Sequence, residues 1–303
     1  LTTLTLAYLR RRPLTLALNV LLVAFSVGTL VLLLLLSMQA NGLLMRDARG
    51  IGLVVTAEGS PLQAILSSIY GLDAPVGNVD VRDVRAVVQN RAVRHAIPLG
   101  LGDTYAGFGI VGTTRGYPEH YAAELASGEW WGEPLEATVG ATVAEQTGLR
   151  VGDTFASAHG AGSQEHDAHP MRVVGVMGQT GTVVDRRILT SLETVWEVHD
   201  AHGGEHDHDH EAHNEAESDA DWLAPPADGA DNRQITSLLL VFESPIAAAL
   251  LGRSIGALPN IQAASPAFEI ARLGRLLGGA VALAQLFGVG LGIAAILTLF
   301  VTL

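Results

Sequence analysis

The sequence contains no cysteine and no lysine among its 303 residues. Without thiols, the chain can form neither a disulfide framework nor a thiolate metal site. All 18 basic residues are therefore arginines, and the lack of lysine excludes the phosphate-binding loop whose lysine contacts a nucleotide. Aromatic residues make up only 5% of the chain, so no platform for stacking bases or sugars is visible.

Acidic residues outnumber basic ones and give a net charge of −13. This balance argues against binding to nucleic acid and against a polybasic membrane patch. Catalytic motifs are also missing, because the sequence has neither a Gly-x-Ser-x-Gly elbow nor a His-Glu-x-x-His helix. The charged group Asp185, Arg186 and Arg187 is interpreted as a solvated structural ion pair. We therefore expect no catalytic and no cofactor-binding residues.

Two long apolar stretches are present, and a mostly polar segment separates them. About 20 residues at roughly 1.5 Å rise cross a hydrocarbon core of about 30 Å. We expect transmembrane helices at 14–40 and 276–303, and an extracytoplasmic domain at 42–270. The sequence begins with Leu and ends inside or just at the end of the second span. We interpret it as the first half of a longer membrane protein, with a complete two-helix protein as the alternative.

Basic residues set the expected orientation. Arg10, Arg11 and Arg12 precede the first span, so residues 1–13 form a short basic segment that should lie in the cytoplasm. The long middle segment should then lie outside the cytoplasm, in the periplasm or at the cell exterior. A cleaved signal peptide is the competing interpretation. It is disfavoured because the apolar run is too long and Met38-Gln39-Ala40 is a poor cleavage site.

The middle segment has the pattern of a mixed α+β domain, which we expect to form two lobes. The β-branched run at 51–57 predicts a strand, and the valine spacing at 80–90 predicts a helix. We expect a hairpin at 93–114 that turns at Gly102-Asp103. Further strands are expected at 137–142, 153–158, 171–177 and 238–243. Further helices are expected at 60–70, 119–126, 143–149, 189–198 and 245–258.

Residues 199–231 are rich in His, Asp and Glu, and they carry almost no large apolar residue. Such a composition cannot build a core, so we expect a disordered surface loop. Neutral imidazole and carboxylate suit Zn²⁺, Cu²⁺ and Ni²⁺, so the loop could gather such ions weakly and without fixed geometry. The competing interpretation is a solvated insertion. The expected metal ligands are His199, His202, His206, His208, His210 and His213. A second group consists of His159, His166 and His169.

Several short motifs, in their order and spacing, resemble one family. They are Gly59–Gln63, Ile69–Asn78, Leu125–Gly128, Ala137–Asp153, Val173–Val176 and Gly181–Arg186. Together with the apolar spans, they resemble the permease subunits of ABC transporters of the MacB and Lol type, also called FtsX-like permeases. The resemblance implies a MacB-like periplasmic core domain between the first two of four membrane helices. The histidine-rich loop departs from the family pattern.

The resemblance implies a subunit that moves rather than one that catalyses. A separate cytoplasmic ABC ATPase would hydrolyse ATP, and the membrane helices would carry the movement to the periplasmic domain. The implied partners are this ATPase, a second permease copy or paralogue, the lipid bilayer, and a periplasmic adaptor or substrate protein. Two other classes stay open: a sensor with two membrane helices, and a membrane-anchored metal-binding protein. The cargo and the direction of transport do not follow from the sequence.

The histidine-rich loop generates a first prediction. If it gathers metal, the outer domain should bind Zn²⁺ or Cu²⁺ with micromolar affinity, and binding should weaken as pH falls through the imidazole range near about 6.5. Replacing His206, His208 and His210 with Ser should remove most of this binding and leave thermal stability nearly unchanged. Titration calorimetry on both forms is the measurement. Equal uptake by both would identify the loop as a solvated insertion.

Overall fold

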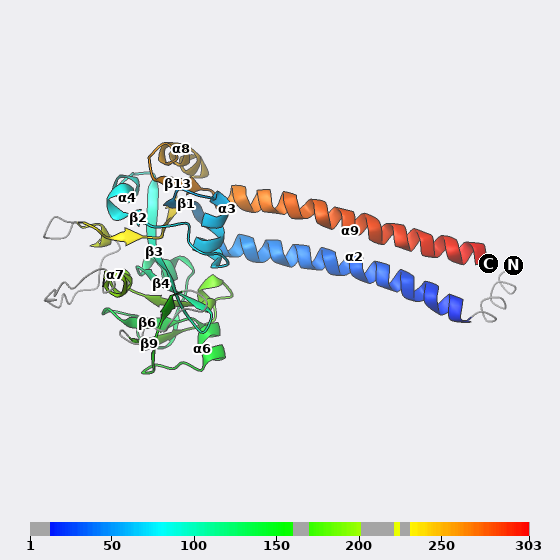
Figure 1. Cartoon of the computed structure of the whole chain (residues 1–303), viewed down its shortest axis with the longest axis horizontal. Coiled ribbons are helices and arrows are strands. Elements are labelled where there is room, and N and C mark those ends of the chain that lie inside the picture. Colours follow the sequence, from blue (N-terminus) through cyan, green and yellow to red (C-terminus); the bar gives the residue numbers. More distant parts are fainter. Residues whose placement is uncertain (1–12, 160–169, 201–220, 225–230, 303) are drawn as a thin grey trace. The chain divides into compact units, whose positions relative to one another are not determined.

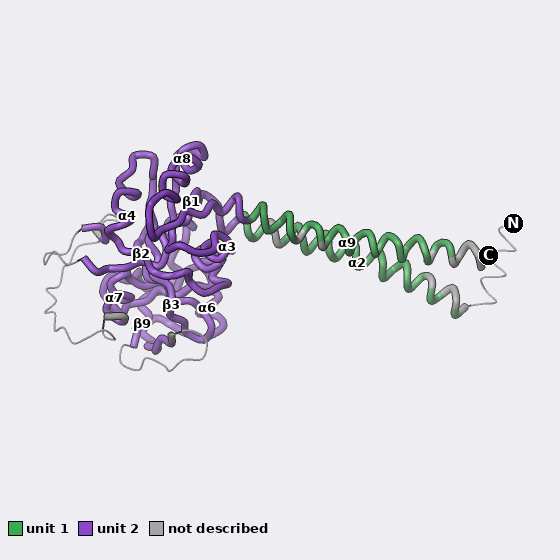
Figure 2. Tube along the Cα trace, turned by 45° about the horizontal axis from the view of Figure 1, so that its top comes forward, with its two compact units in different colours: residues 1–45, 270–303 green, residues 46–269 purple. Residues whose placement is uncertain are grey.

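The computed structural model describes residues 13–159, 170–200, 221–224 and 231–302. By its internal contacts the chain divides into two compact units (Figures 1 and 2). Unit 1 comprises residues 1–45 and 270–303, and unit 2 comprises residues 46–269. Each unit is described by itself below.

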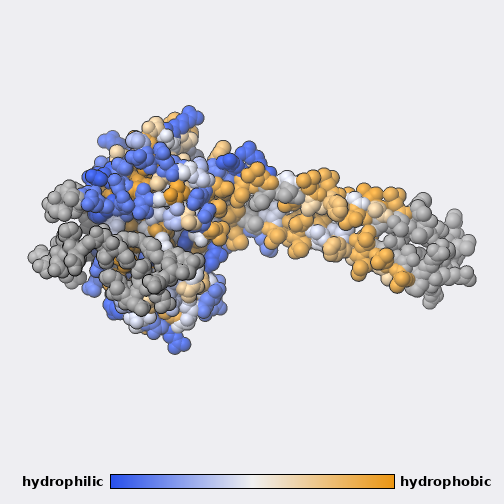
Figure 3. Space-filling view, viewed as in Figure 1, coloured by the Kyte–Doolittle hydropathy of each residue, from blue (hydrophilic) through white to orange (hydrophobic). Residues whose placement is uncertain are grey.

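Unit 1 is built from two long helices. Helix α2 spans Pro13–Asp47 and helix α9 spans Pro266–Thr302, so both extend beyond the predicted spans. Leucine and alanine favour the helical backbone, and apolar side chains surround both helices (Figure 3). Phe25 and Phe287, for example, are each 72% exposed. By length and composition, both helices are able to cross a membrane.

Small side chains bring α2 and α9 together within unit 1. The hydroxyl of Ser26, a buried residue of α2, donates a hydrogen bond to the carbonyl of Gly288 on α9. A Cβ atom added one turn later, at Gly292, would lie 3.5 Å from the same hydroxyl oxygen. This hydrogen bond is a polar contact between two otherwise apolar helices.

Unit 2 contains one sheet of eleven described strands. Its main path runs β13-β1-β12-β3-β4-β10-β6-β9-β5, while β7 pairs with β9 and β8 with β3. The bounds are β1 Ile51–Ala57, β3 Val93–Tyr105, β4 Phe108–Thr113, β5 Leu125–Gly128, β6 Glu136–Val139, β7 Thr154–Phe155, β8 Ala158–His159, β9 Met171–Met177, β10 Arg187–Thr190, β12 Ser237–Phe242 and β13 Ile261–Ala264. Strands β2 (Val79–Asp80) and β11 (Gln234–Ile235) form a separate pair.

Short helices flank this sheet. They are α3 Pro61–Ile65, α4 Val81–Val88, α5 Gly116–His120, α6 Ala141–Thr147, α7 Leu192–Asp200 and α8 Pro245–Ile255, with a π-helical turn at Leu66–Tyr70 and 3₁₀ turns at Val183–Arg186 and Asp221–Leu223. Ser60 caps α3 by accepting a hydrogen bond from the amide of Gln63, and Pro61 occupies the first turn, as its fixed φ angle allows.

Two hydrophobic clusters are found among the described core residues of unit 2. One contains residues of β1, β12, α4 and α8, such as Val55, Leu238 and Val84. The other contains residues of β4, β6, β9 and β10, such as Ile110 and Val173. Because one continuous sheet passes through both clusters, the division of the domain into two lobes stays a prediction. The predicted mixture of helices and strands is confirmed.

Most predicted elements are present, and five expectations are wrong. The predicted strand at 137–142 ends at Val139, and helix α6 begins at Ala141. The predicted strand at 153–158 is two short strands, because β7 pairs with β9 and β8 pairs with β3. The hairpin turns at Ala106-Gly107, whereas Gly102 lies in a register shift between β3 and β4. The segment 119–126 is not a helix, because α5 ends at His120 and β5 begins at Leu125. The predicted helix at 189–198 begins as strand β10, and its helical part starts at Leu192. At 119–126, 137–142, 153–158 and 189–198 the elements are so short that local periodicity does not separate them. In the hairpin, the register shift between Leu101 and Thr104 lets β3 continue past Gly102 to Tyr105.

The end of the predicted histidine-rich loop contributes to the core. Trp222 is 6% exposed and belongs to the first hydrophobic cluster, and Leu223 packs against that cluster. Asp231 is also buried, where Arg85 and Arg233 both form ion pairs with it. Residues 201–220 and 225–230 lie outside the described residues.

Close backbone approach generates the second prediction. A Cβ atom at Gly140 would lie 2.3 Å from the carbonyl oxygen of Asp185, which belongs to the backbone and cannot rotate away. Gly140→Ala should therefore lower the free energy of unfolding by about 1–3 kcal/mol. Gly178→Ala is the matched control, because its added Cβ would lie 3.5 Å from the nearest atom. Thermal unfolding of both variants is the measurement, and equal stability would contradict the assigned packing.

Candidate functional site

The last two residues of helix α2 belong to unit 2, and both contact the segment 181–183. The Nη1 atom of Arg46 donates to the carbonyl of Gly181 at 3.1 Å. The amide of Val183 donates to Oδ1 of Asp47 at 3.0 Å, although 136 residues separate the two in the sequence. Asp47 is only 5% exposed, so this charge-assisted bond is shielded from water. The end of the first long helix is thus fixed to a distant turn of the domain.

Helix α5 and the residue after it hold the carbonyl groups at the same helix end. Such carbonyls have no partner within the helix and need one elsewhere. The hydroxyl of Tyr121 donates to the carbonyl of Asp47, and Nε2 of His120 contacts the carbonyl of Arg49, each at 2.9 Å. Since a carbonyl can only accept, Nε2 must carry the proton. The Tyr121 ring also packs edge-on against the rings of Tyr117 and His120.

The turn that receives the helix end is organised by a second buried acid. Asp185 is 4% exposed, and its carboxylate accepts hydrogen bonds from the amides of Thr180 and Gly181 and from the Thr180 hydroxyl, at 2.7–2.8 Å. The prediction of a solvated ion pair at 185–187 is therefore wrong. Backbone amides surround Asp185, Arg187 is buried, and only Arg186 is exposed. A buried carboxylate with three donors fixes the shape of this turn.

Arg187 begins strand β10 directly after this turn and is 5% exposed. Added Cβ atoms at Gly71 and Gly109 would lie 2.3 and 2.6 Å from its guanidinium, so these glycines make room for it. Its Nε and Nη2 atoms have no hydrogen-bond partner among the described residues. Its positive charge acts on the hydroxyls of Tyr117 and Tyr121. The site therefore combines two buried acids, a buried guanidinium and two buried tyrosines.

Burial fixes the protonation of the aromatic groups. Burial raises the pKa of Tyr121 well above its ordinary value, so its hydroxyl remains a hydrogen-bond donor at any physiological pH. Burial lowers the pKa of His120, and the hydrogen bond with Arg49 opposes that shift only in part. His120 is therefore neutral at pH 7. These groups stabilise the helix end.

The predicted metal ligands fall mostly outside the described residues. His199 lies in helix α7, whereas His202, His206, His208, His210 and His213 lie in 201–220. His159 lies in β8, and His166 and His169 are not described. Within the described ranges, no group of three or more His, Asp or Glu side chains could hold a metal ion. The metal site stays a prediction.

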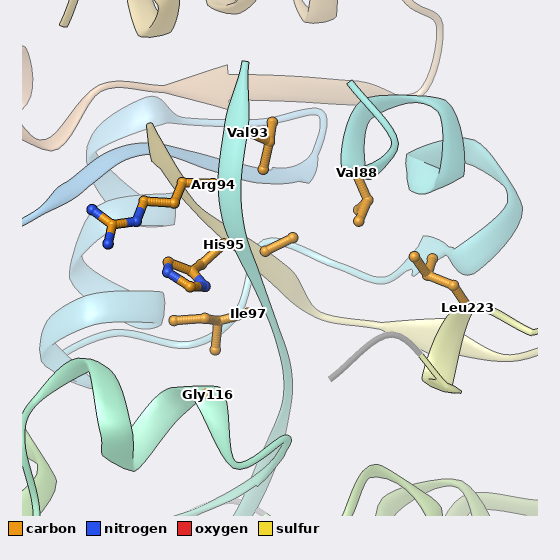
Figure 4. A pocket seen from close by; sticks show the side chains of 8 residues that line it. Val88, Val93, Arg94, His95, Ile97, Gly116 and Leu223 are labelled. Atoms are coloured by element: carbon orange, nitrogen blue, oxygen red, sulfur yellow. The ribbon is translucent and has the colours of Figure 1, made fainter. Parts of the chain in front are cut away.

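A small pocket of about 180 Å³ lies along strand β3. Figure 4 shows Arg94, His95 and Ile97 on one side of the strand and Val88 and Leu223 on the other. Ligand pockets usually enclose about 300–1,000 Å³ with polar groups that converge on one point. This pocket does neither, so it gives no reason to assign a small-molecule site.

Sequence reasoning missed Asp47, His120 and Tyr121 as site residues. One signal was present, because an acid in the last turn of a helix opposes the helix dipole and calls for a specific partner. The partner itself could not be inferred, since Val183 is distant in the sequence and donates through its backbone.

The buried bond of Asp47 generates the third prediction. In Asp47→Ala the Val183 amide loses its acceptor, which should cost about 1–3 kcal/mol and speed hydrogen exchange at residues 180–186. Asp47→Asn keeps an oxygen at the same place and should exchange more slowly than the Ala variant. Exchange followed by mass spectrometry separates the two. Identical exchange in the wild type and Asp47→Ala would show that the helix end does not hold this turn.

Comparison with known proteins adds the family. Residues 16–238 match the family described as "MacB-like periplasmic core domain". The periplasmic region of MacB from Actinobacillus actinomycetemcomitans is similar, with a TM-score of 0.44 and 12% identity, over 76% of this chain and 97% of that one. The extracellular domain of the noncanonic ABC-type transporter YknZ from Gram-positive bacteria gives a TM-score of 0.37 and 11% identity, over 70% and 98%. No similar protein was found among those with curated functions. Because the family match covers most of the sequence, the chain belongs to the MacB-like periplasmic core domain family.

Proposed function

We propose that the chain is the permease component of a MacB-type ABC transporter and performs no chemistry of its own. Family membership supports this proposal most directly. The similar solved domains are named as the periplasmic region of MacB and the extracellular domain of an ABC-type transporter. The 303 residues contain no lysine, so the nucleotide-binding lysine of an ATPase is not among them. A separate cytoplasmic ATPase subunit would supply the energy.

The proposed location is a bacterial inner membrane, with unit 2 in the periplasm. Apolar side chains surround helices α2 and α9, and both helices are long enough to span the hydrocarbon core. The arginines at 10–12 precede the first helix and favour a cytoplasmic N-terminus. The chain would then cross the membrane more than once and would work beside a second permease copy or a paralogue.

The contacts at the end of α2 support a route for movement from the membrane to the domain. A shift of α2 would pull on the turn at 181–183 through Arg46 and Asp47. This turn leads directly into β10, which pairs with β4 on one side and β6 on the other. Because β10 lies inside the sheet and not at its edge, a displacement there would reach the packed core. We infer that β10 is among the strands that respond when the ATPase closes.

A sensor with two membrane helices is the second candidate, since it would also use a helix fixed to an outer domain. Family membership favours the permease. The metal-binding candidate rests on the composition of 199–213 alone, and we propose it as an additional property of the permease that links the cargo to metal. Export and extraction of a substrate are both compatible with the proposed mechanism.

The fourth prediction tests the proposed function. The purified chain should hydrolyse no ATP above background. The full-length gene product, expressed with an affinity tag in its native cell, should co-purify with a cytoplasmic ABC ATPase. The ATPase should be identified by mass spectrometry and should be absent from a tagged control membrane protein. Intrinsic ATP hydrolysis by the purified chain would contradict the proposal. Recovery of a kinase in place of an ATPase would establish the sensor.

A further inference from the structure

Three exposed arginines surround the end of helix α2. They are Arg46 in the last turn of the helix, Arg49 just after it, and Arg186 at the end of the turn that receives the helix, and together we call them the basic patch. The amide of Arg49 donates a hydrogen bond to the carbonyl of Arg46, so the two residues are the ends of one tight turn. The charges of Arg46 and Arg186 both act on the Asp47 carboxylate. Arg46 also donates to the carbonyl of Gly181, five residues before Arg186, so the patch spans the helix end and the turn that receives it.

The arginines of the basic patch lack acidic partners on their own surface. Within the described residues, none of the three forms an ion pair. The two closest acids, Asp47 and Asp185, are buried, and both accept hydrogen bonds from backbone amides. Glu119, the exposed acid of α5, makes no ion pair with them either. Most guanidinium donors of the patch are thus available to a phosphate, which they can bind in a bidentate fashion.

The chain places this patch next to apolar surface. Leu43 and Met45 are 54% and 58% exposed, and the basic residues start immediately afterwards at Arg46. A change from exposed apolar to basic side chains within one helical turn is typical of a helix that leaves hydrocarbon and enters the headgroup layer. The chain as a whole carries −13, so an anionic membrane surface would otherwise repel it.

We propose that the basic patch binds the phosphate headgroup of an anionic phospholipid and so seats unit 2 on the membrane surface. This inference rests on the proposed membrane location of α2. A bound headgroup would neutralise guanidinium charge beside the turn at 181–186 and would hold the helix end at a fixed depth. The same phosphate chemistry also exists in free anions, and the experiment below distinguishes the two sources.

The test uses the full chain in detergent with equal amounts of phosphatidylglycerol and phosphatidylcholine, with retained lipids counted by mass spectrometry. Wild type should prefer phosphatidylglycerol. Each Arg→Gln change in the patch should weaken this preference about fivefold, and the variant R46Q/R49Q/R186Q should lose it. Variant R91Q/R150Q/R253Q is the matched control, because it removes the same charge from exposed arginines elsewhere on unit 2. It should behave as wild type.

Arg46 also bonds to Gly181, so the triple variant could lose stability. The single variants R49Q and R186Q separate lipid binding from stability. The side chains of Arg49 and Arg186 make no hydrogen bond or ion pair with described residues, so the unfolding midpoints of these variants should stay unchanged. A preference that survives in the triple variant, or is lost equally in the control, would overturn the proposal. Displacement by free inorganic phosphate at concentrations that match the lipid would assign the patch to a soluble anion and also overturn it. Alkaline extraction of membranes tests separately whether the chain is inserted in the bilayer. A chain that is extracted would contradict the proposed membrane location, whereas an inserted chain without lipid preference would contradict only the headgroup site.

Discussion

The buried hydrogen bond between Asp47 and Val183 is the constraint on which the rest of this domain depends. A carboxylate removed from water costs several kcal/mol unless donors replace the lost hydration. Asp47 therefore requires a partner, and the partner must hold its position. Asp185 provides this rigidity, because its own carboxylate binds the backbone of Thr180 and Gly181. Two acids that are distant in the sequence thus fix a single junction, one through the helix end and one through the turn.

The position of β10 explains why this junction matters to the whole unit. The strand starts at Arg187, one residue after the 3₁₀ turn that contains Val183. It pairs in parallel with β4 and antiparallel with β6. Its residue Ile188 belongs to the second hydrophobic cluster. On the other side of β4, the sheet continues with β3 and then β12, whose residues belong to the first hydrophobic cluster. Since protein interiors are close-packed, a displacement at the junction, as the proposed mechanism requires, would strain this sheet.

Local patterns predicted most of the regular elements but few of the site contacts. Strands β1 and β9 match their predicted bounds because each is a β-branched run bounded by polar residues or turns. The end of strand β10 was included in the predicted helix at 189–198, because Leu189 fits either period. Arg187 could not be recognised as buried, since its space comes from Gly71 and Gly109 on distant segments. The family resemblance, in contrast, rested on several ordered motifs and was confirmed.

The histidine-rich segment is anchored on both sides by contacts that composition does not reveal. Before the histidines at 199–213, the indole Nε1 of Trp196 on α7 donates to the carbonyl of Gln234 at 2.7 Å. After these histidines, Arg85 and Arg233 both donate hydrogen bonds to the carboxylate of Asp231. The hydrogen bonds from Arg233 hold the pKa of this carboxyl below its usual range, so it stays ionised at neutral pH. Trp222 inserts into the first cluster between these anchors. An ion captured by the predicted histidines would therefore be tethered to the cluster that contains residues of β1 and β12. In the sheet, β12 is followed by β3, β4 and then β10. If both proposals hold, metal capture and helix movement would act on different strands of the same sheet.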